Sequence, residues 1–153
     1  MRWLEHKVPP PIVGALVGVS MWGVAHLLPV LPIQPYLRIA IALVVAGVGV
    51  AFMVLGGMAF RRAKTTSNPI KPEAASSLVI TGVYRYTRNP MYVGAALVLV
   101  GWAFYLGSLP AFAGPVVFAL FITRFQIIPE ERVLRAKFGP EFAEYQARVP
   151  RWL

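Results

Sequence analysis

Four apolar stretches alternate with polar segments along this chain, and they predict its architecture. The stretches cover about 12–33, 39–60, 91–106 and 111–128. The first two reach the roughly 20 residues that a helix needs to cross the hydrocarbon core of a bilayer. The last two are shorter, and Gly107, Ser108 and Pro110 predict a tight break between them. We therefore expect an all-α fold, an integral membrane bundle of about four transmembrane helices with a cytoplasmic C-terminal helical segment.

The polar residues gather in two segments, a loop over 61–90 and a tail over 129–153. Within the tail, apolar side chains recur at helical spacing with Glu and Arg between them; these are Val133, Phe138, Phe142 and Tyr145. This spacing predicts an amphipathic helix from Pro129 to Arg148. Because glycine and proline interrupt helices, the pair Gly139 and Pro140 is expected to break it into two pieces.

Composition supports a membrane location. The chain is 58% hydrophobic and 14% charged, whereas soluble domains carry about 25% charged residues. Cysteine and aspartate are absent and no cluster has metal-ligand spacing, so we expect no thiol chemistry and no metal site. The net charge of +9 is not accompanied by a nucleic-acid motif, so anionic lipids are the expected partners rather than nucleic acid.

The distribution of positive charge predicts the topology. Six of the 15 Lys and Arg residues lie between the second and third apolar stretches, and six lie at or beyond the end of the fourth. Only Arg38 lies on the opposite side of the expected bundle. Cytoplasmic segments are enriched in Lys and Arg, so both termini and the middle loop are expected in the cytoplasm, with the bundle in the cell inner membrane.

Small residues recur at four-residue spacing in the first two apolar stretches. Gly14 and Gly18 form one such pair, and Ala42 and Ala46 form another. Such spacing lets helices approach closely in lipid, so we expect these residues to serve helix packing.

A first polar block, 82–94, lies where the loop enters the third apolar stretch and reads GVYRYTRNPMYVG. Asn89 is a good N-cap, and Pro90 suits the first turn of a helix. The start of a helix offers unpaired N–H groups and the positive end of its dipole. With Arg85 and Arg88 beside it, this helix start is expected to bind a carboxylate or a phosphate.

A second polar block begins at Glu130 and Glu131, where the fourth stretch is expected to leave the membrane. Adjacent residues of a helix point about 100° apart, so one carboxylate can face a ligand while the other pairs with an arginine. A simpler interpretation of both blocks is a charged collar at the membrane surface, and neither block alone names a reaction.

Together and in this order, the two blocks resemble the integral membrane methyltransferases related to isoprenylcysteine carboxyl methyltransferase and phosphatidylethanolamine N-methyltransferase. The resemblance covers roughly Pro69 to Trp152. It is carried by the block 82–94, by Glu130 and Glu131, and by Phe138, Gly139, Tyr145 and Val149. It implies a single membrane methyltransferase-like domain over 1–153 that uses S-adenosylmethionine.

The resemblance also implies a site formed by the last helices and the C-terminal segment. The implied cofactor-binding residues are Tyr84, Arg88, Asn89, Pro90, Tyr92, Glu131, Tyr145 and Arg151. The implied catalytic residues are Arg85, Arg88 and Glu130. Many relatives carry His at the position of Asn89, so a role that needs an imidazole is not expected here.

The expected acceptor is a lipophilic small molecule or a lipidated substrate that reaches the site from the bilayer. A carboxylate acceptor needs only a cation to orient it, which Arg85 or Arg88 can supply. An amine acceptor needs a proton acceptor, for which Glu130 or Glu131 is the candidate. Two other interpretations stay open, namely a membrane reductase relative that uses a nicotinamide cofactor and a membrane scaffold without enzymatic activity.

Overall fold

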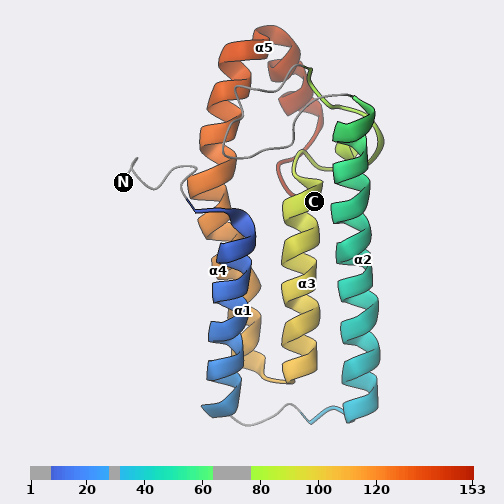
Figure 1. Ribbon diagram of the computed structural model, residues 1–153, viewed down its shortest axis with the longest axis vertical. Coiled ribbons are helices and arrows are strands. Elements are labelled where there is room, and N and C mark those ends of the chain that lie inside the picture. Colours follow the sequence, from blue (N-terminus) through green and yellow to red (C-terminus); the bar gives the residue numbers. More distant parts are fainter. Residues whose placement is uncertain (1–7, 28–31, 64–76) are drawn as a thin grey trace.

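The computed structural model describes residues 8–27, 32–63 and 77–153, and every regular element in these ranges is a helix. The elements are α1 (Pro10–Leu27), α2 (Pro35–Arg62), η3 (Gly82–Arg85), α3 (Pro90–Leu106), η4 (Leu109–Phe112), α4 (Ala113–Ile122), η5 (Thr123–Ile127) and α5 (Ile128–Arg148). The long helices run along one axis, with α3 between α1 and α2, and α5 extends beyond the others (Figure 1). The expected all-α membrane bundle is confirmed.

The first two helices differ from the predicted ranges. α1 ends at Leu27, and Pro32 and Ile33 are not helical, so the predicted extension to residue 33 is wrong. α2 is longer than predicted, from Pro35 to Arg62. A uniformly apolar stretch carries no periodic signal for its ends. Both helices begin at a proline, Pro10 and Pro35, which suits the first turn because the missing N–H is not needed there.

Helices α2 and α3 form the closest packed pair, and small residues make this possible. A Cβ atom added at Gly49 would lie 2.6 Å from the carbonyl oxygen of Gly94, and one added at Gly101 would lie 2.8 Å from the carbonyl oxygen of Ala42. Any larger side chain at these glycines would push the helices apart. The packing role expected for Ala42 is therefore observed against α3.

The fourth helix does not stop at the predicted membrane exit but continues through η5, a π-helical turn, into α5. A π-turn inserts one residue into the helical register and so rotates everything that follows it. Gly139, with φ 49° and ψ −121°, interrupts α5, which confirms the predicted break. Leu134, before this kink, packs against the buried cluster that contains Phe142 and Tyr145, which follow the kink.

Among the described residues, three helical rods are long and apolar enough to cross a membrane: α1, α2 and the continuous rod Leu109–Arg148. α3 has 17 residues and therefore spans about 26 Å, slightly less than the roughly 30 Å of a bilayer core. A short third helix was expected. Of the loop predicted over 61–90, residues 64–76 lie outside the described residues, while Arg61 and Arg62 belong to α2 and Gly82–Arg85 form η3.

Candidate functional site

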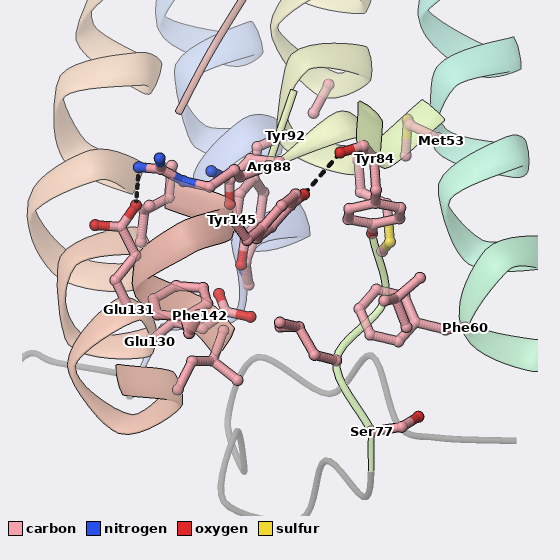
Figure 2. Close-up of a pocket in the computed structure, with 18 of the residues that line it drawn as sticks. Met53, Phe60, Ser77, Tyr84, Arg88, Tyr92, Glu130, Glu131, Phe142 and Tyr145 are labelled. Atoms are coloured by element: carbon pink, nitrogen blue, oxygen red, sulfur yellow. Dashed lines mark hydrogen bonds and ion pairs between the residues drawn. The ribbon is translucent and has the colours of Figure 1, made fainter. Parts of the chain in front are cut away.

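A cavity of about 310 Å³ lies where α1, α2, α3 and α5 meet, at the polar end of the bundle. Its lining comes from α1, α2, the segment 77–89, the first turns of α3, the end of η5, and α5: Pro10, Pro11, Gly14, Met53, Phe60, Ser77, Leu78, Val79, Tyr84, Arg88, Asn89, Met91, Tyr92, Ala95, Ile127, Glu130, Glu131, Leu134, Phe142 and Tyr145. Cofactor and small-molecule sites typically measure about 300–1,000 Å³, with apolar walls and few polar groups. We call this space the site cavity (Figure 2).

Glu131 is the centre of an ion-pair cluster on one wall of the site cavity. Its Oε1 accepts a hydrogen bond of 2.7 Å from Arg88, and its Oε2 accepts one of 2.7 Å from Arg151 (Figure 2 shows the first). Burial alone would raise the pKa of Glu131, but the hydrogen bonds and charges of Arg151 and Arg88 outweigh it and lower that pKa. Glu131 is therefore a firmly ionised carboxylate that joins α3 to the C-terminal segment.

In addition to pairing with Glu131, Arg88 binds the C-terminal end of α5. Its Nη1 donates to the carbonyl oxygens of Gln146 at 3.1 Å and of Val149 at 2.7 Å. These carbonyls belong to the last turn of a helix and the residue after it, where no backbone N–H group is available to them. The Nε of Arg88 is buried and has no hydrogen-bond partner within the described residues.

The C-terminal segment docks directly on the start of α3. The N–H of Arg88 donates to the carbonyl oxygen of Pro150, and the carbonyl oxygen of Arg151 accepts hydrogen bonds from Thr87 Oγ1 and Asn89 Nδ2. Asn89 stands at the predicted N-cap position, but its side chain makes no capping hydrogen bond. The capping role predicted for its side chain is wrong, because that amide binds Arg151 instead.

Glu130 faces the site cavity and, unlike Glu131, is not paired with an arginine (Figure 2). It makes no hydrogen bond or ion pair with the described part of the chain. Protein encloses the carboxyl group, while the cavity keeps it accessible. Burial, and then the charge of Glu131, raise the pKa of Glu130 to about 7. The two adjacent carboxylates thus divide as their 100° separation predicted, one paired with arginine and one facing the cavity.

Two tyrosines close the cavity on the side of η3. The hydroxyl of Tyr145 donates a 2.8 Å hydrogen bond to the carbonyl oxygen of Tyr84 (Figure 2). The ring of Tyr84 meets Phe60 of α2 edge to face, with centroids 5.4 Å apart. These contacts fix α5, η3 and α2 relative to one another around the cavity.

The structure brings most of the predicted site residues together. Those that line the cavity are Tyr84, Arg88, Asn89, Tyr92, Glu130, Glu131 and Tyr145. Pro90 is buried at the start of α3, and Arg151 lies behind Glu131, so both are next to the cavity without lining it. Arg85 is exposed and is not among the lining residues, which separates it from the catalytic position expected for it.

Sequence reasoning missed the apolar half of the site. Pro10 and Gly14 of α1, together with Met53 and Phe60 of α2, line the cavity although they lie far from both polar blocks in the sequence. Nothing in their types distinguishes them from lipid-facing residues of the same helices. Phe142 was expected on the apolar face of the C-terminal helix, but its place on a cavity wall depends on how α5 folds back.

Comparison with known proteins gives the family. A family model described as phospholipid methyltransferase matches residues 37–141, which is more than half of the chain. A protein of Haemophilus influenzae named only "Uncharacterized protein" is 43% identical over 63 residues, covering 41% of this chain and 100% of that protein. No solved structure gives a significant match.

Two named relatives are methyltransferases. Protein-S-isoprenylcysteine O-methyltransferase of Schizosaccharomyces pombe is 34% identical over 76 residues, covering 48% of this chain and 31% of the relative. Protein-S-isoprenylcysteine O-methyltransferase B of Arabidopsis thaliana is 32% identical over 116 residues, covering 69% of this chain and 57% of the relative. The chain thus spans less than two thirds of either enzyme. The matched family model covers α2, α3, α4 and most of α5, the helices that carry both polar blocks, and the chain belongs to the phospholipid methyltransferase family.

Proposed function

We propose that this protein transfers a methyl group from S-adenosylmethionine to a lipophilic acceptor in the site cavity. The main support, in a chain of the phospholipid methyltransferase family, is the composition of the site cavity. A cavity with apolar walls on the membrane side has an unpaired carboxyl, Glu130, and an arginine–glutamate cluster at its polar end. A water-soluble charged cofactor and a lipid meet most readily at such a boundary.

The polar atoms of the cavity fit the methionine part of S-adenosylmethionine. Arg88 has a buried Nε donor without a partner among the described residues, and Glu130 has an unpaired carboxyl. One donor and one acceptor match the carboxylate and the ammonium of the cofactor. The aromatic rings of Tyr84 and Tyr92 offer apolar surface for the remainder. When bound, the cofactor supplies an electrophilic methyl group on its sulfonium.

The residues of this chain act by positioning and by excluding water. Arg88, held by Glu131 and the end of α5, keeps the start of α3 and the C-terminal segment in one arrangement. The hydrogen bond between Tyr145 and Tyr84 keeps the cavity closed on one side. Alignment of the two reactants in a closed site accounts for a large part of the rate acceleration of an in-line displacement.

Two acceptor classes have support, each from a different observation. A carboxylate acceptor is what the names of the two isoprenylcysteine O-methyltransferase relatives indicate. An amine acceptor is favoured by Glu130, because this carboxyl has a pKa of about 7 and can take the proton that an amine loses. Arg88 and Arg151 are already paired with Glu131, so a carboxylate acceptor would have to share them.

The test is incubation of purified protein in lipid nanodiscs with methyl-labelled S-adenosylmethionine and a lipid extract, followed by identification of the labelled lipid. Glu131→Ala is the inactivating variant. Glu144→Ala is the matched control, because Glu144 makes an exposed 3.6 Å ion pair with Arg148 away from the cavity. Calorimetry with S-adenosylmethionine and with a nicotinamide cofactor distinguishes a methyltransferase, which binds the first, from a reductase, which binds the second. A folded protein that binds neither cofactor and labels no lipid would overturn the proposal.

A further inference from the structure

The π-helical turn η5 carries two polar side chains that bind segments far away in the sequence. Gln126 Nε2 donates a 2.7 Å hydrogen bond to the carbonyl oxygen of Val8, which precedes α1. Thr123 Oγ1 accepts a 3.1 Å hydrogen bond from the indole N–H of Trp152, which follows α5. The partners are 118 and 29 positions apart, so both bonds are tertiary contacts. A single turn of helix therefore holds the segment before α1 and the segment after α5.

Gln126 is fully enclosed by protein, with 0% of its surface exposed. Its amide nitrogen is paired with Val8, whereas its Oε1 has no hydrogen-bond partner among the described residues. An unpaired buried acceptor costs stability, and an apolar side chain of the same length would avoid that cost. This half-paired amide therefore favours a role in placing Val8 over a role in stabilising the fold.

The hydrogen bond of Gln126 fixes one wall of the site cavity. Val8 is two positions before Pro10, which is the first residue of α1 and lines the cavity. On the other side of the bond, Ile127 lines the cavity directly after Gln126. Glu130 follows four positions after Gln126, about 6 Å along the helix. The bond therefore sets how closely the start of α1 approaches the carboxyl that faces the cavity.

The hydrogen bond of Thr123 acts on the C-terminal segment. Trp152 directly follows Arg151, whose guanidinium pairs with Glu131 at 2.7 Å. The carbonyl oxygen of Arg151 also accepts hydrogen bonds from the residues before α3. The ring of Trp152 packs against the largest buried cluster of the bundle. Thr123 therefore helps to hold the segment that supports the arginine–glutamate cluster of the site.

Another hydrogen bond attaches α1 to the bundle at a point away from the site. Trp102 Nε1 of α3 donates a 3.0 Å hydrogen bond to the carbonyl oxygen of Gly18, and neither residue lines the site cavity. Gly18 lies about 12 Å along α1 from its first residue. The α1 segment thus has two attachments of the same kind, of which only the one at Val8 is beside the cavity.

We propose that Gln126 and Thr123 are positioning residues of the site cavity, because the π-turn η5 sets the places of α1 and of the C-terminal segment through Val8 and Trp152. This inference rests on the proposed methyl transfer. Gln126 places the apolar α1 wall, so its loss impairs alignment of the acceptor. Thr123 places the segment that carries Arg151, so its loss weakens cofactor binding. A displacement of about 1 Å remote from the reacting atoms can lower a rate about 100-fold.

The test compares two variants of η5 with a matched control. Gln126→Met keeps the length of the side chain and removes the donor, and Thr123→Val keeps the shape and removes the hydroxyl. Trp102→Phe is the control, because it removes the same kind of bond from α1 away from the cavity. Each protein is assayed in nanodiscs with S-farnesylcysteine and with dioleoyl phosphatidylethanolamine as acceptors. Calorimetry gives the affinity for S-adenosylmethionine, and a thermal-shift assay gives the Tm.

Gln126→Met is expected to lower kcat/KM for the active acceptor roughly 10- to 100-fold, with cofactor affinity within about 2-fold of wild type. Thr123→Val is expected to weaken cofactor binding roughly 3- to 10-fold, which tests the second bond independently. Trp102→Phe should lower the Tm and leave both kinetic and binding constants unchanged. Equal losses of kcat/KM in Gln126→Met and Trp102→Phe would reduce the effect to stability and overturn the inference, as would wild-type kinetics in Gln126→Met.

Hydrogen exchange separates this inference from the proposed function, because it needs no turnover. The N–H groups of Ile12 and Val13, which donate to the carbonyl oxygen of Pro9, should exchange about 10-fold faster in Gln126→Met and at the wild-type rate in Trp102→Phe. Unchanged exchange there, with normal methyl transfer, would overturn the inference alone. Faster exchange together with a wild-type protein that binds no cofactor and transfers no methyl group would overturn the proposed function and, with it, the role of η5 in that reaction.

Discussion

Arg88 binds Glu131 through a 2.7 Å ion pair that joins the segment two positions before the start of α3 to the first turn of α5. The two residues are 43 positions apart in the sequence, and both side chains are largely buried, at 11% and 14% exposure. A pair so enclosed differs from a charged collar at a membrane surface, where side chains would extend into water.

Arg88→Lys should reduce methyl transfer while leaving expression and topology unchanged. Lysine keeps the positive charge but cannot bind Glu131 and two carbonyl oxygens with a planar fork. We expect at least a 10-fold loss, since a hydrogen bond to a charged group contributes about 1.5–3 kcal/mol. Arg148→Lys is the control, because Arg148 is exposed. Wild-type turnover of well-expressed Arg88→Lys would support the collar interpretation.

Glu131→Ala should weaken binding of S-adenosylmethionine roughly 10- to 150-fold, which corresponds to about 1.5–3 kcal/mol. The change removes a carboxylate from the cavity wall. It also leaves Arg88 and Arg151 without their partner, which loosens the C-terminal segment. Calorimetry on protein that elutes as a monodisperse peak measures the effect. Affinity equal to that of wild type would remove Glu131 from the site.

Glu130 should impose a pH dependence if the acceptor is an amine. Its pKa is raised to about 7, so the group is protonated below that pH and accepts a proton only above it. With an amine lipid, kcat/KM should therefore rise with pH through about 7. Glu130→Gln should abolish this inflection and lower the rate by about 10²–10⁴. With a carboxylate lipid no base is needed, and we expect no such inflection.

Tyr145→Phe should lower thermal stability and raise KM for the cofactor. The change removes the hydroxyl that donates to the carbonyl oxygen of Tyr84 while the ring still fills the cavity wall. Leaving a buried carbonyl unpaired costs about 1–3 kcal/mol. A thermal-shift assay in detergent and steady-state kinetics measure the two effects. Unchanged values in both would show that water replaces the hydroxyl without loss.

The topology prediction places both termini in the cytoplasm. Reporter fusions at Gly107 and Leu153 should give opposite signals, because an odd number of membrane crossings separates these positions in the expected bundle. A reporter active on the outer side at Leu153 would reverse the orientation, while equal signals at both positions would mean that the rod after η4 does not cross.

The sequence by itself determined the membrane bundle and the two polar blocks. Long apolar stretches can satisfy their backbone in lipid only as helices, so hydropathy placed α2 and α3 to within four residues at each end, whereas the end of α1 was predicted six residues too late. Adjacent Glu130 and Glu131 had to point in different directions because of helical geometry. Arg88 was expected at the site because it lies beside a helix start, whereas the place of Tyr145 at the site came from family resemblance alone.

Tertiary structure alone decided which glutamate meets arginine, because the π-turn before α5 sets the rotation of everything after it. It also decided that Arg85 stays exposed while Arg88 clamps the C-terminal segment. Finally, it distinguished Gly18 from Gly101. The two glycines look alike in an apolar helix. Only the structure shows that a Cβ atom at Gly101 would lie 2.8 Å from the carbonyl oxygen of Ala42, whereas one at Gly18 would make an ordinary 3.9 Å contact with Leu99.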